Sequence, residues 1–338
     1  MSLYYRPIPK LDLTKGSNSM LLAGGNIFFD EVEVLKRGFK SYIIPAFKIP
    51  RTIKNDLIRP RPSTLGFSYL DPAIMGIINI TPDSFSDGQE DLSTETVVKK
   101  VQKMLQDGAN IIDIGGESTR PGFEKVPVED ELSRVIPVIE AIRNAGLSIP
   151  ISVDTMKATV AEQALRKGAN MINDVSGMDF DKDMMSVIKN SEAQICLVHS
   201  QIGKEKDTKP YQYENILLDI YDYLAQKITT AIDYGIPKSK IIIDPGVGFN
   251  KNLTQNLILL NGLSLFHTLG CRLLIGASRK GFIGTITGES RPNRRMAGSL
   301  VVGLEAIKQG VQVLRVHDIA EHYQALSMWK AVALDCRN

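Results

Sequence analysis

The amino-acid sequence predicts an α/β protein whose main part is a (β/α)8 barrel, or TIM barrel, with an N-terminal extension. Eight short apolar segments rich in β-branched residues recur along the chain, with helical patterns between them. Eight strand–helix units are the number that closes such a barrel. An open doubly wound sheet would carry a glycine-rich turn after an early strand, and the chain contains no G-x-G-x-x-G pattern.

The predicted strands are almost continuously apolar, which is typical of strands buried on both faces of a parallel sheet. They lie at residues 74–80, 110–115, 150–155, 171–176, 194–200, 240–246, 272–278 and 311–318. The helix predicted over 94–108 has an apolar stripe that includes Val97, Val101 and Met104. Another is predicted over 158–168, where Gly168 would form the C-cap, and two more over 296–310 and 322–334.

The sequence also predicts where the barrel begins. We expect the barrel to occupy residues 71–338 and the extension to occupy residues 1–70. The proline-rich stretch RPRP at 59–62 is typical of an extended linker. Residues 21–38 are compatible with a hairpin or a short helix. We expect the extension to pack on the barrel, and no residue in it indicates a particular chemistry.

The composition argues against several classes of partner. The chain has 40 Lys and Arg against 38 Asp and Glu, a net charge of +2, which favours neither nucleic acid nor a membrane surface. No apolar run approaches the roughly 18 residues of a membrane span, and the start lacks the apolar stretch of a signal peptide. Three scattered cysteines, Cys196, Cys271 and Cys336, indicate reduced thiols, so we expect a cytoplasmic protein.

Polar side chains stand at the C-terminal end of every predicted strand, where barrel enzymes place their catalytic residues. A single polar strand end is as compatible with a structural role as with a functional one, but a full set indicates one shared pocket. Two carboxylates and an amide suit a ligand rich in N–H donors, such as an aminopyrimidinone ring: Asp154, Asn173 and Asp244. Cationic groups that would bind a phosphate or a carboxylate are Arg120, Lys280, Arg315 and His317.

Oxygen ligands follow the first predicted strand, where Asp83 and Asp87 come after Asn79. Hard oxygen ligands beside a phosphate suit Mg²⁺, which usually keeps several waters and few protein ligands. No cluster of His and Cys supports a zinc site. The segments TPDSFSDG (81–88) and STRPG (118–122) have the composition of mobile turns, which can close over a substrate and exclude water.

At these residues the chain resembles the dihydropteroate synthase family of folate biosynthesis. Seven stretches match in family order over residues 74–320: IMGIINITPDSFSDG, GANIIDIGGESTRPG, ISVDT, MINDVSG, IIIDPGVGF, GASRKGFIG and LRVHD. The resemblance implies a transferase that joins 6-hydroxymethyl-7,8-dihydropterin pyrophosphate to p-aminobenzoate and releases 7,8-dihydropteroate and pyrophosphate. It also implies Mg²⁺ as the cofactor, a homodimer, and competition of sulfonamides with p-aminobenzoate.

The resemblance further implies roles for single residues. The positions that match the family's pterin pocket and its walls are Asp154, Asn173, Asp244, Gly248, Phe249 and Lys280. The positions that match the pyrophosphate and magnesium site are Asn79, Arg315 and His317. Three positions are implied to be catalytic: Asp87 in the first loop, Arg120 in the second, and Lys280. Thr119 and Pro121 flank Arg120 in the loop that would close over the substrates.

Two positions on the pterin or p-aminobenzoate side depart from the family pattern. Ser200 follows His199 where the family often has Met, and Gly281 follows Lys280 where it often has Ser or Arg. Neither change removes a charged group. His199 is compatible with a place in the pocket or with a satisfied histidine at a strand end. His267 and His322 are expected on the surface.

Two alternative functions stay open at this point. One is a methyltetrahydrofolate-dependent corrinoid methyltransferase, which uses a related barrel and a cobalamin partner. The Arg315–His317 pair and the ESTRPG loop argue against it, because that reaction has no pyrophosphate to bind. The other is a non-catalytic pterin-binding paralogue, which the departures at Ser200 and Gly281 leave open.

Overall fold

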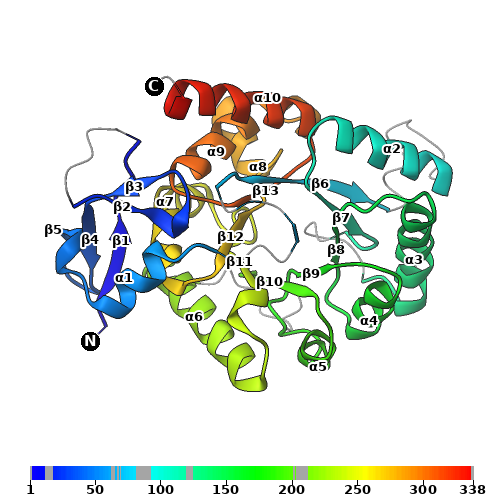
Figure 1. The fold of residues 1–338 in the computed structure, drawn as a ribbon, viewed down its shortest axis with the longest axis horizontal. Helices are drawn as coiled ribbons and strands as arrows, with labels where there is room; N and C mark the ends of the chain where they lie inside the picture. The colour runs from blue at the N-terminus through cyan, green and yellow to red at the C-terminus, as the bar shows by residue number, and fades with distance from the viewer. Residues whose placement is uncertain are drawn as a thin grey trace.

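A closed barrel of eight parallel strands forms the centre of the computed structural model (Figure 1). The structure describes residues 2–11, 18–61, 65–66, 68, 70–80, 93–118, 125–200, 202 and 212–335. The order around the barrel is β10-β11-β12-β13-β6-β7-β8-β9, so β13 pairs with β6 and closes the ring. The strands are β6 (Ala73–Asn79), β7 (Ile111–Gly115), β8 (Ile151–Asp154), β9 (Met171–Asp174), β10 (Gln194–Val198), β11 (Ile241–Asp244), β12 (Arg272–Ile275) and β13 (Val313–Val316).

A layer of helices surrounds the barrel (Figure 1). In chain order they are α2 (Thr94–Gln106), α3 (Val128–Asn144), α4 (Ala158–Arg166), α5 (Met184–Lys189), α6 (Ile216–Tyr234), α7 (Leu253–Asn261), α8 (Gly281–Thr287), α9 (Met296–Lys308) and α10 (Ile319–Lys330). Short turns of helix are η4 (Lys238–Lys240), η5 (Leu263–Leu269), η6 (Pro292–Arg294) and η7 (Ala331–Asp335). The predicted barrel and all eight predicted strands are therefore confirmed.

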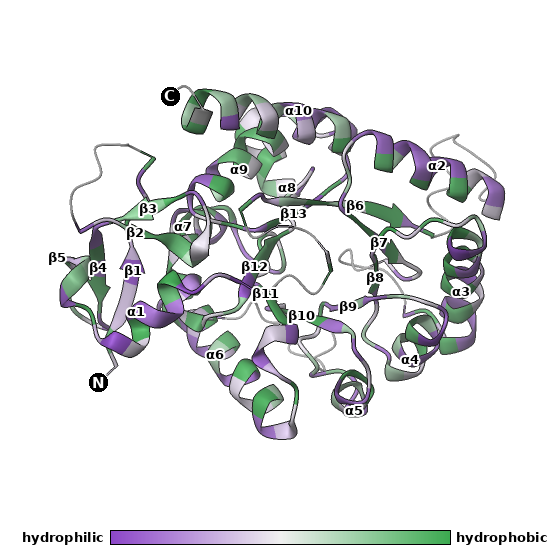
Figure 2. Ribbon diagram, in the orientation of Figure 1, coloured by the Kyte–Doolittle hydropathy of each residue, from purple (hydrophilic) through white to green (hydrophobic). Residues whose placement is uncertain are grey.

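The strands are buried on both sides, which explains why most of their residues are apolar (Figure 2). Side chains that alternate toward the helices form the larger core, with Ile112, Ile114 and Val153 among its members. Those that point into the barrel form a smaller core, which includes Met75, Ile111, Met171, Cys196, Ile242, Leu274 and Val313. Toward the C-terminal ends of the strands, the residues that point into the barrel are polar.

Local signals in the sequence define several of the helix ends. The side chain of Ser93 accepts the N–H of Thr96 and caps α2. Asn252 and Gln255 form a reciprocal capping box at the start of α7. Gly168 has φ = +104° just beyond α4, so a left-handed residue ends that helix as predicted. No helix in the described part of the chain is long and apolar enough to cross a membrane.

Two histidines that were expected on the surface are buried, and that prediction is wrong. His267 is fully buried in η5, where its Nε2 lies 2.9 Å from the carbonyl oxygen of Gln309. Burial and the charge of Arg61 lower the pKa of His267 to about 3. His322 is buried on α10, where its Nδ1 lies 2.6 Å from the carbonyl oxygen of Asp318. The extension covers His267 in η5, whereas His322 is covered by α9, next to Gly303. Neither tertiary contact leaves a local pattern in the sequence.

The extension contains more strand than the sequence predicted. A three-stranded antiparallel sheet has the order β1 (Tyr4–Pro7), β4 (Glu31–Leu35), β5 (Tyr42–Pro45). A small pair joins β2 (Met20–Leu21) to β3 (Phe28–Phe29). The helical pieces are η1 (Leu22–Gly24), η2 (Ala46–Lys48) and α1 (Arg51–Ile58). Residues 21–38 thus hold strands and one helical turn, and we propose that the boundary with the barrel lies between residues 70 and 71.

The extension packs against η5, which directly precedes β12 and so lies at the N-terminal end of the barrel. Arg61 is buried there, and its guanidinium donates to the carbonyl oxygens of Asp56 (2.7 Å), Arg59 (2.9 Å) and His267 (2.9 Å). Arg272 of β12 donates back to the carbonyl oxygen of Arg61 at 3.2 Å. The part of the predicted linker that the structure describes is therefore a packed contact.

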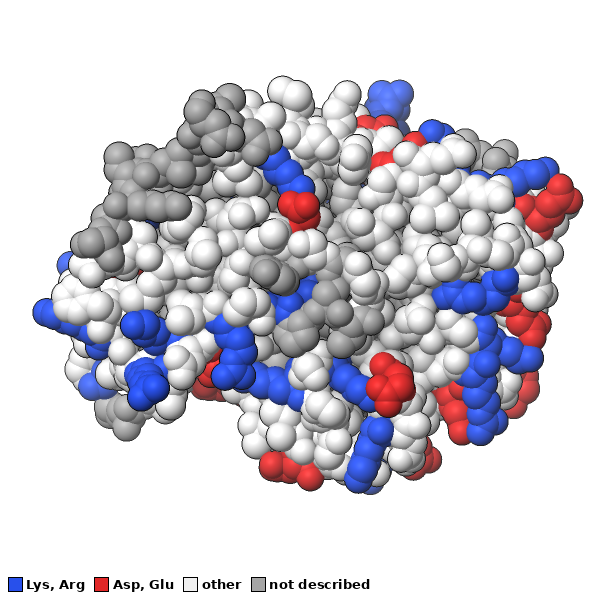
Figure 3. Space-filling model, viewed as in Figure 1, with Lys and Arg blue, Asp and Glu red and all other residues white. Residues whose placement is uncertain are grey.

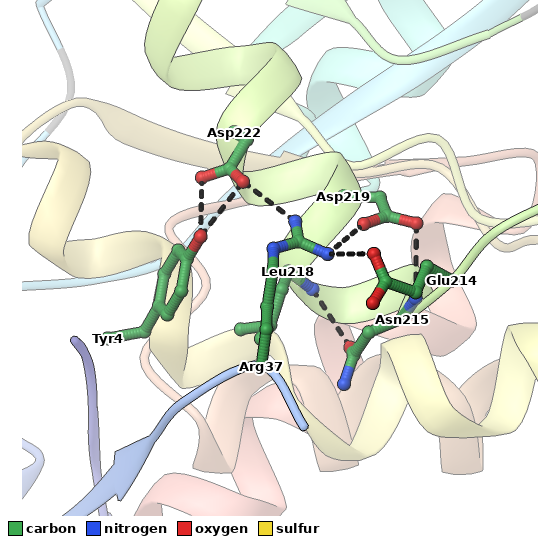
Figure 4. Close-up of polar contacts among 7 residues, drawn as sticks. All are labelled: Tyr4, Arg37, Glu214, Asn215, Leu218, Asp219 and Asp222. Atoms are coloured by element: carbon green, nitrogen blue, oxygen red, sulfur yellow. Dashed lines mark hydrogen bonds and ion pairs between the residues drawn. The ribbon is translucent and has the colours of Figure 1, made fainter. Parts of the chain in front are cut away.

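A second contact joins the extension to the first two turns of α6 (Figure 4). Arg37 pairs with Asp219 at 2.5 Å and with Asp222 at 2.7 Å, and Glu214 lies 3.6 Å away. The hydroxyl of Tyr4 donates to Asp222 at 2.9 Å. Negative charge near a helix N-terminus is favourable, and Arg37 neutralises the excess.

We expect Arg37→Ala to lower the free energy of unfolding by about 1 kcal/mol, because the pair is only partly shielded from water. Chemical denaturation measures this change. Arg51→Ala is the matched control, because Arg51 is exposed in α1 and has no acidic partner within the described ranges. We expect the control to stay within about 0.5 kcal/mol of the wild type. Equal losses in the two variants would contradict the role of this contact.

Candidate active site

The C-terminal mouth of the barrel gathers the polar side chains that the sequence singled out. Asp154, Asn173 and Asp244 stand at or next to the ends of β8, β9 and β11. Arg315 projects from β13, and Lys280 follows β12. An added Cβ at Gly276 would lie 3.7 Å from Arg315 and 4.0 Å from Asp244, so both side chains border this glycine. The predicted convergence on one site is observed for these residues.

Arg315 is the central cation of this mouth. Its Nε donates to Asp113 at 2.6 Å, and its Nη2 donates to Asp154 at 2.8 Å. The sequence interpretation placed Arg315 with the anion-binding groups, apart from the carboxylates. The structure instead bonds it to two carboxylates, so its guanidinium connects the acidic floor to the cationic side of the mouth.

Asp113 is a functional candidate that the sequence reasoning missed. It is fully buried inside the barrel, where it accepts hydrogen bonds from Arg315 and, at 2.6 Å, from Ser152. Asp113 lies two residues before the end of β7, so it shares an inward face with the strand end at Gly115. The alternation of a strand therefore held the signal, which was overlooked because Asp113 is not the terminal residue.

Asn173 has unused hydrogen-bonding capacity. Its Nδ2 makes one long contact, 3.5 Å from Asp113, and its buried Oδ1 has no hydrogen-bond partner in the described part of the structure. A buried amide oxygen without a partner costs about 1–3 kcal/mol, which a bound N–H donor would recover. This orphaned acceptor is what a site for an amino-substituted ring would present.

The turn after β11 connects Asp244 to Lys280. Asp244 accepts the backbone N–H of Gly246 at 2.7 Å. Lys280 donates to the carbonyl oxygen of Val247, and its Nζ lies 3.9 Å from the centre of the Phe249 ring, a cation–π contact. Gly248 has φ = +83°, and a Cβ there would lie 2.3 Å from Cδ of Lys280. Only glycine allows the turn and the lysine to approach this closely.

Lys251 is a second residue that the sequence reasoning missed. Its Nζ donates to the carbonyl oxygens of Gly246 (2.8 Å) and Phe249 (3.2 Å), and it lies 3.2 Å from Nδ1 of His199. A lysine in a polar loop is usually solvated, so no pattern in the sequence singled it out. In the structure this lysine fastens both sides of the turn that carries Val247 and Phe249.

His199 belongs to the wall behind this turn. It is buried after β10, and its ring packs edge-on against Tyr223 with the centroids 4.9 Å apart. Tyr213 packs on it at 6.0 Å. Ser200, one of the departures from the family pattern, donates to the carbonyl oxygen of Val175. Gly281, the other departure, is the first residue of α8, and no atom lies within 4 Å of an added Cβ.

The remaining described candidates lie toward the rim. His317 follows β13, and its Nδ1 lies 3.1 Å from Oγ of Ser278. Asn79 ends β6, and a Cβ on Gly115 would lie 3.5 Å from its Oδ1, so the amide faces β7. Within the described residues, no group of three His, Cys, Asp or Glu side chains could hold a metal ion.

Glu117 joins the two described edges of the second loop. One of its oxygens accepts the backbone N–H of Val126 at 3.0 Å, and the other accepts from buried Lys157 at 2.6 Å. This bond connects the flanks of the segment that carries three candidate residues. The candidates Thr119, Arg120 and Pro121, like Asp83 and Asp87 of the first loop, lie outside the described residues.

Burial shifts the ionisation of the charged groups in the mouth. It raises the pKa of Asp154 to about 7, with Asp113 adding to the rise and Arg315 opposing it. Burial also raises the pKa of Asp244, although Lys280 and Arg315 lower it. The same burial lowers the pKa of Lys280 to about 8, and Asp244 opposes this fall. The pKa values of Asp154 and Lys280 thus lie close to neutral pH, as is common in active sites.

Comparison with known proteins agrees with this geometry. The family described as pterin binding enzyme matches residues 75–317. The dihydropteroate synthase of Synechocystis sp. is 41% identical over 264 residues, which cover 77% of this chain and 91% of that protein. The solved structure of the Xanthomonas albilineans dihydropteroate synthase with 4-aminobenzoic acid has a TM-score of 0.73 and 40% identity, and covers 79% of this chain and 95% of that one.

A second structure of the Xanthomonas albilineans enzyme, in complex with 7,8-dihydropteroate, has a TM-score of 0.71 and 38% identity over 79% of this chain and 96% of that one. The matched region runs from within β6 to the residue after β13 and contains the described polar residues of the mouth. The family model covers well over half of the chain, and the relatives align over most of their own length. The chain therefore belongs to the pterin-binding enzyme family, as a dihydropteroate synthase.

Proposed function

We propose that the mouth of this barrel joins 6-hydroxymethyl-7,8-dihydropterin pyrophosphate to p-aminobenzoate, with roles for its residues as follows. The observation that carries the proposal is the buried set of acceptors beside fixed cations. Asp154, Asn173 and Asp244 would bind the amino group and ring N–H groups of the pterin. The relatives' complexes with 4-aminobenzoic acid and 7,8-dihydropteroate support the choice of substrate and product.

Charge and position would supply most of the catalysis. The bond from the pterin methylene carbon to pyrophosphate breaks, and its electron pair leaves with pyrophosphate. The positive charge that develops on the methylene is stabilised by the electron-rich ring and the nearby carboxylates. The amine of p-aminobenzoate then forms the new C–N bond and releases a proton. Such a displacement needs orientation and charge stabilisation and requires no activated protein nucleophile.

The cations would bind the anionic parts of the substrates. Lys280 stands beside Asp244 at the junction of the pterin and p-aminobenzoate sides, with Gly248 and Phe249 as walls. Arg315 and His317 would contact the pyrophosphate. We further propose that Asp87 orders the first loop, and that Arg120, Thr119 and Pro121 close the second loop over the substrates. Closure would exclude water from the charged intermediate.

Mg²⁺ would enter with the pyrophosphate and neutralise its charge. The described donors fit this arrangement, because Asn79 offers one hard amide oxygen at the rim and the substrate offers several more. Asp83 and Asp87 are the further oxygen ligands nearby in the sequence. We also propose that the protein acts as a homodimer in the cytoplasm, by analogy with the family.

The direct test is a single assay. We expect the protein, with Mg²⁺, the pterin pyrophosphate and p-aminobenzoate, to form dihydropteroate and release pyrophosphate. Lys280→Ala and Asp154→Asn should each reduce turnover roughly 10- to 100-fold, because each loses a charge-assisted hydrogen bond. A wild type that binds the pterin without turnover would instead identify a non-catalytic paralogue. Full activity in either variant would refute that residue's role.

The pH dependence follows from the raised pKa of Asp154. Its carboxylate is ionised above about pH 7 and becomes protonated below it, which removes an acceptor from Arg315 and from the pterin. We expect kcat/KM for the pterin substrate to fall as the pH drops below about 7. In Asp154→Asn this fall should become shallower. The part of the pH dependence that remains comes from Asp244 and from the substrate, which the wild type and the variant share. An unchanged pH profile would be evidence against this assignment.

Lys251 should act as a positioning residue. Lys251→Met removes the donor that fastens the 246–249 turn, so we expect the KM for the pterin substrate to rise about tenfold or more. Lys251→Gln keeps two N–H donors and should recover part of the loss. If Lys251 only positions the turn, the KM for p-aminobenzoate and the midpoint of unfolding should stay close to the wild-type values. General damage to the fold would change both. Equal effects of Met and Gln on the pterin KM would overturn the role.

Removing Mg²⁺ should weaken binding of the pterin pyrophosphate and leave the free pterin unaffected, because only the former carries the phosphates that the ion neutralises. Calorimetric titration of both ligands with and without chelator measures the difference. Asn79→Ala should reduce the gain in affinity that Mg²⁺ brings. The same affinity with chelator present would contradict the magnesium proposal.

A further inference from the structure

The outer strand of the extension has a free edge. In the sheet order β1-β4-β5, β5 has β4 as its sole neighbour among the strands described. Ala46 N–H bonds to the carbonyl oxygen of Asp30 at 2.8 Å, which fixes the alternation of hydrogen bonding between β4 and β5. By that alternation Ile44 faces β4, and Ile43 turns its N–H and carbonyl oxygen outward. Pro45 has no N–H to offer on that edge.

Large apolar side chains stand exposed around this edge. They lie along β5 and the turns on either side of it and so form one patch, and a patch of this kind marks an interaction site. Their exposed fractions are 60% for Phe39, 54% for Tyr42, 59% for Ile43 and 55% for Phe47. An exposed, apolar strand edge is a template for pairing unless something covers it.

The same segment is strongly basic. Residues 34–55 contain six Lys and Arg and no Asp or Glu. Arg37 is bound to the acids of α6, but Lys40, Lys48 and Arg51 are exposed and have no acidic partner in the ranges that the structure describes. Residues 1–70 hold eleven Lys and Arg against five Asp and Glu, whereas residues 71–338 hold 29 against 33. Lys and Arg predominate over the extension, at the left of Figure 3.

We propose that the outer edge of β5 binds an extended, acidic segment of another protein, which adds to the sheet as a fourth strand. Backbone groups of the segment pair with Ile43, its apolar side chains cover Tyr42 and Phe47, and its carboxylates neutralise Lys40 and Lys48. Strand addition of this kind takes its affinity from the backbone and its specificity from side chains on alternate positions. The partner is thus defined by its chemistry as an acidic, β-prone peptide.

An acidic extended segment accounts for the free strand edge, the exposed apolar side chains and the basic residues. Each alternative occupant leaves at least one of these features unexplained. A lipid surface would meet the cations and the aromatic rings, but would leave the free N–H and carbonyl groups of the edge without partners in an apolar phase. Nucleic acid would stack on the rings but has no use for the strand edge. A second copy of this chain, paired edge to edge, would bring two sets of uncompensated lysines together.

The experiment uses the whole protein and a ten-residue peptide that alternates valine and glutamate, with capped ends and a fluorescent label. Its counterpart alternates valine and lysine. We expect fluorescence anisotropy to show binding of the acidic peptide and none of the basic one. Binding should weaken as the salt concentration rises, because ion pairs at the surface are screened.

One pair of variants separates the contribution of the backbone N–H to peptide binding from that of the side chain. A second pair separates the effect of charge at the β5 edge from the effect of the net charge of the protein. Ile43→Pro removes the outward N–H without disturbing the pairing with β4, whereas Ile43→Ala trims the side chain and keeps that N–H. We expect the Pro variant to bind about tenfold more weakly than the Ala variant. Lys40→Glu with Lys48→Glu should abolish binding, while the equal charge change Lys100→Glu with Lys182→Glu, outside the extension, should not.

The synthase activity of every variant should match the wild type, which shows that a loss of peptide binding is not a loss of folding. The proposal is overturned if the acidic peptide does not bind, or if the Pro and Ala variants bind it equally. It is also overturned if the protein binds phosphatidylglycerol vesicles but not the peptide. Dissociation of an oligomer by Ile43→Pro alone, measured by sedimentation, would show that a second copy occupies the edge.

Discussion

The mouth of the barrel depends on one buried ion cluster, in which Arg315 is held between Asp113 and Asp154. Each of these charges would be costly to bury alone, and Arg315 compensates one of the two negative charges while bonding to both carboxylates. The cluster exists because barrel closure places β7, β8 and β13 around one small interior. Once it has formed, Asp154, Asn173 and Asp244 present acceptors upward over a floor that cannot rearrange cheaply.

The opposite wall is held by a turn and not by a strand. Gly246 and Gly248 allow the chain after β11 to fold back, and Lys251 binds two carbonyl oxygens of that turn. Lys280 binds a third and stacks on Phe249. Because both lysines bind the same turn, the position of Lys280 depends on a residue that need not contact any substrate.

Much of the fold was predictable because strands buried on both faces leave continuous apolar segments, and all eight were located. The polar strand ends were predictable for the same reason, because a charged residue next to a buried apolar segment is costly unless it has a bonding partner or a ligand. Asp113 was missed because it lies inside an apolar strand, where the alternation shows its importance only once the barrel interior is known. Lys251, His267 and the sheet of the extension were beyond prediction, because distant parts of the chain determine their surroundings.

We propose that Asp113 and Arg315 act as one unit in presenting the pterin site. The measurement that tests this coupling is a double-mutant cycle with Asp113→Ala and Arg315→Ala, read out as the free energy of pterin binding by calorimetry. If the pair is a unit, the double variant should bind scarcely more weakly than either single variant, with a coupling of about 1.5–3 kcal/mol. Strictly additive losses would show that the two residues act independently and would overturn the proposed unit.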